Sequence, residues 1–306
     1  MAITAGMVKE LRGLTGAGMM DCKKVLTEAE GSIEKAVELL REKGLAAAEK
    51  KAGRIAAEGL VKVIISDDNK AAAIVEVNSE TDFVSKNEIF ITYVNDVATQ
   101  VMKSEAKSVD ELMEESWIND ETAKVKEVLI NKISTIGEKL SIRRFEKLTS
   151  NEGFLVSYTH GGGRIGVLVE FKCEEVNDKL IEAGKNIAMQ IAAVRPKYVS
   201  REEVSEEYLA KEKEILTQQA LNEGKPAAIV EKMVVGRLNK ELKEVCLLDQ
   251  VYVKDGELTV SKYIDSVAKE VGSKLEVKKF VRFETGEGIE KREENFAEEV
   301  AKQMGV

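Results

Sequence analysis

The chain reads GLVKVIIS at residues 59–66, DDNK at residues 67–70 and AAAIVEV at residues 71–77. The first segment alternates along an extended chain, with Leu60, Lys62 and Ile64 on one face and apolar residues on the other. The four polar residues between the two segments are typical of a tight turn. This stretch therefore predicts a β-hairpin.

The same theme recurs later in the chain. The first hairpin is followed by predicted helices at residues 89–102 and 121–140. The second occurrence comprises a strand at 154–160, a GGGR turn at 161–164, a strand at 165–171 and a helix at 180–194 that ends before Pro196. We therefore expect an α+β fold whose core has two parts with antiparallel sheets. The matching order of elements makes internal duplication one interpretation of this core.

Three short helices are predicted before the first hairpin. Thr4 precedes a helix with Met7, Val8, Leu11 and Leu14 on one face, and a second helix covers residues 19–29. The third begins after Ser32 and is expected to end at Gly44. Residues 45–58 are rich in Ala and Lys and read as a solvated helical linker. Together these segments predict a small helical bundle.

Two charged amphipathic helices are predicted at residues 204–221 and 226–245. The short connection at 222–225 makes them an antiparallel hairpin. Strand patterns resume at 247–253, 258–260 and 277–283, so the hairpin interrupts the second part of the core. The predicted domains are the bundle with the start of its linker (1–54), the first core part (55–150), the second core part with the hairpin at about 198–245 (151–285) and a C-terminal helical module (286–306).

Length, charge and cysteine spacing argue against several classes of protein, among them nucleic-acid-binding, membrane and zinc-binding proteins. The length of 306 residues exceeds the usual size of one core, and the net charge of −9 argues against direct binding to nucleic acid. No stretch approaches the ~18 uncharged apolar residues of a membrane span, and the opening residues lack an export signal. The cysteines, Cys22, Cys173 and Cys246, are too widely spaced for a zinc or disulfide framework. We expect a cytoplasmic protein without cofactor, metal or membrane contact.

The chain has a single histidine, His160. Mechanisms that need two imidazoles are excluded, and no local signature marks a serine or cysteine nucleophile. The glycine run at 161–164 lacks the spacing of a phosphate-binding loop, and its flanking strands favour a hairpin turn with positive φ angles. We therefore expect no catalytic residues, with a hydrolase that uses His160 as the remaining enzymatic alternative.

The segment NSETDFV at residues 78–84 places a phenylalanine among charged residues at the end of a predicted strand. One interpretation is that Phe83 is exposed for contact with another molecule. The other is that Phe83 covers the core under the next helix, while Asp82 caps the N-terminus of that helix. Composition and pattern alone favour the second interpretation.

Several segments resemble the bacterial elongation factor Ts family. They occur in the family's order along nearly the whole chain. The segments are VKELR at 8–12 with TGAGMMDCKK at 15–24, EVNSETDFV at 76–84, SYTHG at 157–161, GGRIGVLV at 162–169, and RFE at 282–284 with GEGIEK at 286–291. The N-terminal match is long and specific.

The resemblance implies a fold, a partner and a function. The fold would be an N-terminal bundle like a ubiquitin-associated domain, a two-part α+β core, an inserted helical hairpin and a final helix at 289–304. The partner would be elongation factor Tu, a GTPase that holds GDP and Mg²⁺ tightly, in its GDP-bound and nucleotide-free forms. The function would be guanine-nucleotide exchange in translation elongation, a binding activity rather than catalysis.

The resemblance also implies which residues bind the partner. Thr81, Asp82, Phe83 and Val84 would form a tip that intrudes beside the nucleotide and displaces the elements that hold Mg²⁺ and the phosphates. Other contacts would come from Arg12, Met19, Met20, Ile136, His160 and Gly161. For Arg12, Met19 and Met20, ordinary packing in the bundle core is an equal alternative.

Another function and a possible self-association stay open beside the exchange activity. The chain could be a scaffold of the ubiquitin-associated type that binds partners without affecting nucleotide. Some family members self-associate through the hairpin, which implies a homodimer, whereas the same apolar residues could instead join the two helices to each other.

Overall fold

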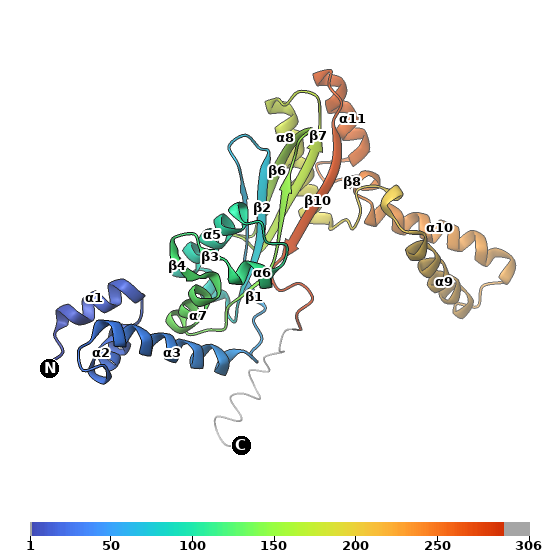
Figure 1. Cartoon of the computed structure of the whole chain (residues 1–306). Coiled ribbons are helices and arrows are strands. Elements are labelled where there is room, and N and C mark those ends of the chain that lie inside the picture. The colour runs from blue at the N-terminus through green and yellow to red at the C-terminus, as the bar shows by residue number, and fades with distance from the viewer. Residues whose placement is uncertain (1, 291–306) are drawn as a thin grey trace. The chain divides into compact units, whose positions relative to one another are not determined.

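A computed structural model describes residues 2–290 (Figure 1). The chain divides into two compact units. The first comprises Met1–Lys62, Val75–Phe145 and the segment from Glu284, and the second comprises Val63–Ile74 and Glu146–Phe283. Helices combine with antiparallel sheets, so the predicted α+β fold is confirmed. The predicted final helix at 289–304 lies outside the described residues from position 291.

Three helices form the N-terminal bundle: α1 (Ala5–Thr15), α2 (Met19–Glu28) and α3 (Ile33–Lys51). The Thr4 hydroxyl caps α1 by accepting a hydrogen bond from the Met7 amide at 3.3 Å. Their shared core consists of Val8, Leu11, Cys22, Val25, Leu26, Ala29 and Ala36. Leu14, predicted to share this apolar face, is exposed instead. 

Gly44 does not end the third helix, contrary to the prediction. It is buried within α3, where an added Cβ would lie 3.4 Å from Cγ2 of Ile130. Gly44 thus packs beside Ile130, and α3 continues to Lys51 through much of the predicted linker. 

The first core part contains a three-stranded sheet of order β1-β2-β5. Its strands are β1 (Glu58–Ile65), β2 (Ala71–Ser79) and β5 (Ser141–Thr149). Between β2 and β5 lie α4 (Asp82–Ser85), α5 (Glu88–Lys103), α6 (Val109–Glu114), β3 (Ser116–Trp117), β4 (Asp120–Lys124) and α7 (Val125–Ile136). The hairpin at 59–77 and the helix at 89–102 are confirmed.

The helix predicted at 121–140 is too long at both ends. Residues 120–124 pair as a strand with β3, and α7 begins only at Val125. A Glu127 carboxylate oxygen accepts from the Lys124 amide at 2.8 Å, which fixes this start. Gly137, with φ of 86°, ends the helix in a left-handed cap.

The second core part is built on a sheet of order β10-β7-β6. The strands β6 (Gly153–His160) and β7 (Ile165–Lys172) pair antiparallel along their full length, and β10 spans Glu276–Glu284. Gly161, Gly162 and Gly163 all have positive φ angles, so the predicted hairpin turn is confirmed. Helices α8 (Asp178–Val194) and α11 (Val260–Val271) bury their apolar faces in the core of this part.

The predicted antiparallel hairpin forms from α9 (Glu206–Asn222) and α10 (Ala227–Val245). Ala220, Val230 and Val234 are buried together with Leu216 between the two helices. Packing of the helices on each other thus accounts for part of the apolar set. Ile215 and Ile229 remain exposed, and self-association stays a prediction.

The segment after the hairpin departs from the predicted strands. Residues 247–253 contain a 3-10 helix, Leu247–Asp249, and only a two-residue strand, β8 (Val251–Tyr252). Residues 258–260 divide between β9 (Asp255–Thr259) and α11, a helix that the pattern did not predict. Another 3-10 helix, Arg201–Glu203, precedes α9.

The two core parts share a topology beyond the order of their elements. In each, a strand hairpin is followed by a long helix, α5 or α8, and later by a short two-stranded ladder, another helix and a last strand beside the second strand of the hairpin. The short helices α4 and α6 in the first part, and the helical hairpin in the second, are additions to this shared order. Gln100 of α5 accepts from the Ile118 amide at 2.8 Å and donates to the Ser116 carbonyl at 3.2 Å. Gln190 of α8 does the same with Val253 and Val251, at 2.8 and 3.1 Å. This repetition supports the interpretation of an internal duplication.

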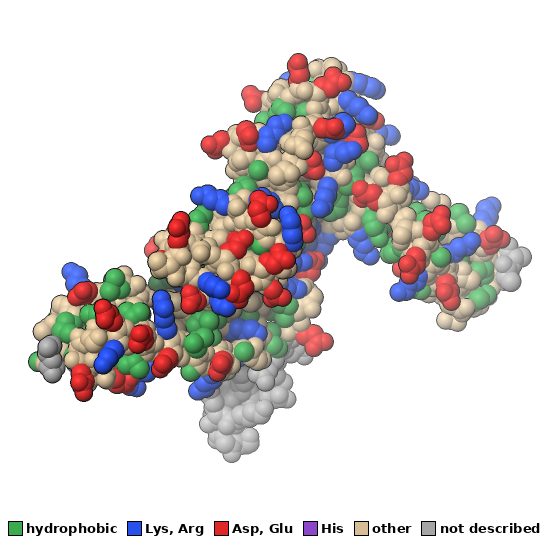
Figure 2. Space-filling model, in the orientation of Figure 1, with side chains coloured by type: hydrophobic (Ala, Val, Ile, Leu, Met, Phe, Trp, Pro, Cys, Tyr) green, Lys and Arg blue, Asp and Glu red, His purple; other side chains and the backbone are tan. Residues whose placement is uncertain are grey.

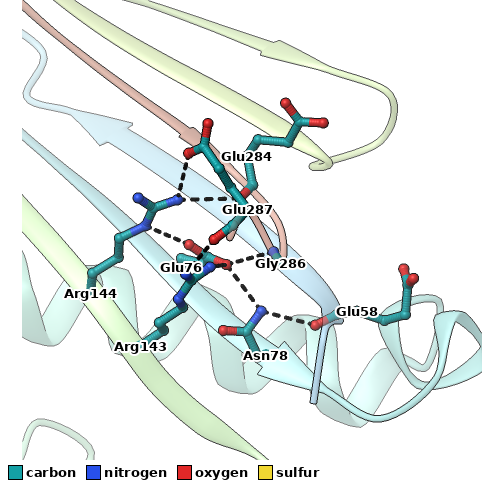
Figure 3. A network of polar contacts seen from close by, with 8 residues as sticks. All are labelled: Glu58, Glu76, Asn78, Arg143, Arg144, Glu284, Gly286 and Glu287. Atoms are coloured by element: carbon teal, nitrogen blue, oxygen red, sulfur yellow. Dashed lines mark hydrogen bonds and ion pairs between the residues drawn. The ribbon is translucent and has the colours of Figure 1, made fainter. Parts of the chain in front are cut away.

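A buried carboxylate joins β2 to the segment that follows β10 (Figure 3). Glu76 has no exposed surface, and it accepts from Arg143 at 2.9 Å, Arg144 at 2.6 Å and the Gly286 amide at 2.8 Å. Burial alone would raise the pKa of Glu76. The hydrogen bonds and the Arg144 charge outweigh burial and hold this pKa below its ordinary value. An added Cβ on Gly286 would lie 2.0 Å from the Ala57 carbonyl, so the approach requires glycine.

Acidic and basic side chains are interspersed over the face drawn in Figure 2. Within residues 2–290, no helix has both the length and the hydropathy needed to cross a bilayer.

Candidate functional site

The predicted tip is a single helical turn, α4, between β2 and α5. Phe83 is 79% exposed, whereas its neighbour Val84 is buried. Thr81, rather than Asp82, is the N-cap, because its hydroxyl accepts from the Val84 amide at 3.5 Å. The Asn87 side chain separately caps α5. Phe83 therefore projects into solvent, and the interpretation that it covers the core is wrong.

Asp82 lies at the surface of the same turn. Its carboxylate pairs with the Lys86 ammonium group one turn later, at 2.7 Å. The hydrogen bond from Lys86, helped by its charge, lowers the pKa of Asp82 despite slight desolvation. The tip therefore carries an ionised acceptor beside an exposed aromatic ring at neutral pH.

Glu138 holds the chain at the start of the tip. One oxygen of its carboxylate accepts from the Glu80 and Thr81 amides at 3.1 and 3.0 Å. Glu138 follows Gly137, which caps the helix that ends at Ile136. Glu138 thus links the main chain just after the half-buried Ile136 to the main chain at the start of the tip.

The three predicted bundle residues lie at the surface. Met19 and Met20 open α2 and are 60% and 73% exposed, and Arg12 on α1 is also exposed. The alternative that the methionines form the bundle core is wrong, because residues from the opposite faces of the helices fill that core. Figure 2 shows hydrophobic side chains at the surface of this part of the chain. Flexible thioethers at a surface suit contact with another protein.

His160 and Gly161 lie at the turn between β6 and β7, in the second unit. His160 is exposed, and its Nδ1 lies 3.1 Å from the Tyr158 hydroxyl. Among residues 2–290 no hydrogen bond joins it to a serine, cysteine or carboxylate. The three cysteines are buried, which raises the pKa of each thiol and disfavours the thiolate nucleophile. This geometry offers no support for the hydrolase alternative.

The sequence reasoning missed Glu80 and Glu138. Each lies within a segment rich in charged residues, and their partners are 57 to 59 positions away along the chain. A local pattern cannot identify such a pair. In the described part of the chain, three or more His, Cys, Asp or Glu side chains nowhere gather in an arrangement suited to a metal ion.

Comparison with known proteins assigns the family. Residues 80–287 match the sequence profile described as Elongation factor TS. The chain is 61% identical over 302 residues to Elongation factor Ts of Clostridioides difficile, with 99% of both chains covered. It is 60% identical to the protein of that name from Clostridium novyi and 58% identical to that from Clostridium perfringens, again with 99% coverage of both chains. The chain therefore belongs to the elongation factor Ts family of translation elongation factors.

Proposed function

We propose that this chain is a guanine-nucleotide exchange factor for elongation factor Tu. It binds the GDP-bound GTPase, promotes release of GDP and leaves a nucleotide-free complex that GTP can enter. The observation that carries this proposal is the exposed Phe83 on a short helix whose N-cap residue, Thr81, is hydrogen-bonded to Glu138. An apolar ring on a fixed base suits insertion into another protein, because little ordering remains to be done on binding.

In this proposal the tip weakens the contacts that hold Mg²⁺ and the phosphates in the partner. Phe83 enters between elements of the nucleotide site, and the ionised Asp82 supplies hydrogen-bond acceptors beside them. With its charge less well neutralised, the diphosphate binds less tightly. Thermodynamic reciprocity then requires that GDP weaken the binding of this chain by the same factor. The chain itself makes and breaks no covalent bond.

The remaining site residues hold the complex together. Arg12, Met19 and Met20 dock the bundle on the GTPase, where burial of exposed thioethers is favourable. Ile136 from the first core part, and His160 with Gly161 from the second, provide further contacts. The predicted domain boundaries divide these contacts among the bundle and the two core parts.

The test is release of a fluorescent GDP preloaded on purified elongation factor Tu. Increasing concentrations of this chain should accelerate release to a plateau, and excess free Mg²⁺ should oppose that acceleration. If release keeps its uncatalysed rate at every ratio of the two proteins, the proposed function is wrong, and the scaffold alternative becomes the better description.

A further inference from the structure

Two carboxylates, from Glu80 and Glu138, form reciprocal hydrogen bonds at the start of the tip. Glu138 accepts from the amides of Glu80 and Thr81, and a Glu80 carboxylate oxygen accepts from the Lys139 amide at 2.5 Å. The Glu138 side chain thus binds the main chain of residues 80 and 81, and the Glu80 side chain binds the main chain of residue 139. We name these four residues, Glu80, Thr81, Glu138 and Lys139, the root clamp.

The root clamp reaches the helix that carries Phe83. The Thr81 hydroxyl donates to the second oxygen of Glu138 at 2.6 Å and accepts from the Val84 amide. The Glu138 carboxylate therefore orients the hydroxyl that caps α4. Removing that carboxylate frees two main-chain amides and the capping hydroxyl together.

The same clamp fixes the chain that leaves the bundle. The Arg54 guanidinium pairs with the Glu80 carboxylate at 3.2 Å. The Lys139 ammonium donates to the carbonyls of Ala52 and Arg54 at 2.7 and 2.8 Å. These contacts lie within the first unit and anchor the segment between α3 and β1 to the loop that holds the tip.

The duplicated core offers an internal comparison. Residues 137–140 after α7 read GEKL, and residues 272–275 at the same place after α11 read GSKL. Gly137 and Gly272 both adopt positive φ angles as helix caps. The two loops thus differ only by Glu138 and Ser273. In the second part, residues 173–177 join β7 to α8 without a helix, whereas residues 80–87 join β2 to α5 and include α4. The glutamate occurs in the part that has a tip to hold.

We propose that Glu138 is a positioning residue for Phe83, and that the root clamp sets the angle at which the ring enters the partner. This inference rests on the proposed exchange function. A clamp that acts before binding should affect how fast bound GDP leaves and should spare the contacts made by the bundle. Displacement of a working group by about 1 Å can cost on the order of a hundredfold in rate.

The test compares Glu138→Ser, Glu138→Gln and a control, Glu121→Ala, which removes an exposed carboxylate from the same unit. Serine copies the loop at Ser273, so the main variant should fold. Glutamine keeps a carbonyl oxygen for the two main-chain amides and an amide group that can donate to the Thr81 hydroxyl. Glu138→Gln should therefore keep the plateau rate that Glu138→Ser loses. Release of fluorescent GDP is measured against concentration of the chain, and hydrogen exchange of the Glu80 and Thr81 amides is followed by NMR in the free chain.

We expect Glu138→Ser to lower the plateau rate of GDP release by about tenfold or more, with the half-saturating concentration changed less than about twofold. Its Glu80 and Thr81 amides should exchange at least about tenfold faster, while Glu138→Gln and Glu121→Ala stay near wild type. A wild-type plateau in Glu138→Ser despite faster amide exchange would overturn the inference, as would a lowered plateau with unchanged amide exchange. If the wild-type chain does not accelerate GDP release, the proposed function fails, and the amide measurement still decides whether Glu138 orders the root of the tip.

Discussion

Replacing Phe83 with alanine should leave the free chain stable and slow exchange strongly. Because the ring is 79% exposed, few contacts are lost, and the free energy of unfolding should change by less than about 0.5 kcal/mol. Full burial of a phenylalanine side chain contributes roughly 1.5–3 kcal/mol. The exposed fraction leaves about 2 kcal/mol of this for burial against the partner. Since about 1.4 kcal/mol corresponds to a factor of ten, the loss is up to about thirtyfold.

The assay is the apparent second-order rate of fluorescent GDP release from elongation factor Tu, together with thermal unfolding of the free variant. Val251→Ala is the matched control, because it removes a hydrophobic side chain that is 59% exposed in the second unit. It should behave as wild type in both measurements. Release at the wild-type rate by Phe83→Ala would refute the role given to the ring. A melting temperature lowered by several degrees would refute the reasoning from exposure.

Three further substitutions test other parts of the chain. Glu76→Gln should lower the free energy of unfolding by about 3 kcal/mol, because it places a neutral amide against arginine donors in a buried network. A free energy of unfolding from urea titration that lies within about 0.5 kcal/mol of the wild-type value would contradict this. The lowered pKa of Glu76 means that its stabilising contribution is present above the ordinary value of 4.5 and is lost as pH falls through the folded value, so the variant should lose that part of the acid sensitivity. Met20→Ala should raise the half-saturating concentration in the release assay several-fold and leave the plateau rate unchanged, because Met20 is proposed to dock the bundle on the GTPase. A lowered plateau rate would contradict this docking role. For His160→Ala, neither variant nor wild type should hydrolyse a model ester, and activity lost with the imidazole would restore the hydrolase alternative.

Sequence patterns predicted the elements whose signals are local. The hairpins at β1-β2 and β6-β7 have alternating apolar residues and turn chemistry within about twenty positions, so their pairing could be predicted. β5 was missed because charged residues interrupt its pattern at Arg143 and Arg144. Their shared partner, Glu76, lies 67 and 68 positions earlier in the chain. A strand stabilised by such distant ion pairs has no local signature.

The exposure of Phe83 was likewise beyond local reasoning. Both Thr81 and Asp82 are good N-cap residues, and pattern alone favoured the arrangement in which Asp82 caps and the ring is buried. In the structure Thr81 caps α4, and the Glu138 carboxylate, from a distant part of the chain, accepts from the Thr81 amide and hydroxyl. Phe83 is exposed, as the family resemblance implies, whereas its contact with a partner stays a prediction.

The second core part shows that this fold does not need the tip. Its strand and helix are joined by residues 173–177, with no equivalent of α4 and no carboxylate in the loop equivalent to Glu138. In the first part, the longer connection orders additional residues, at about 1–2 kcal/mol of backbone entropy each, and leaves an aromatic ring in water. Neither cost is offset by burial of Phe83 in the free chain. The root clamp nevertheless holds the start of the turn by hydrogen bonds. Under the proposed function, a partner would bury Phe83 with much of its ordering already done.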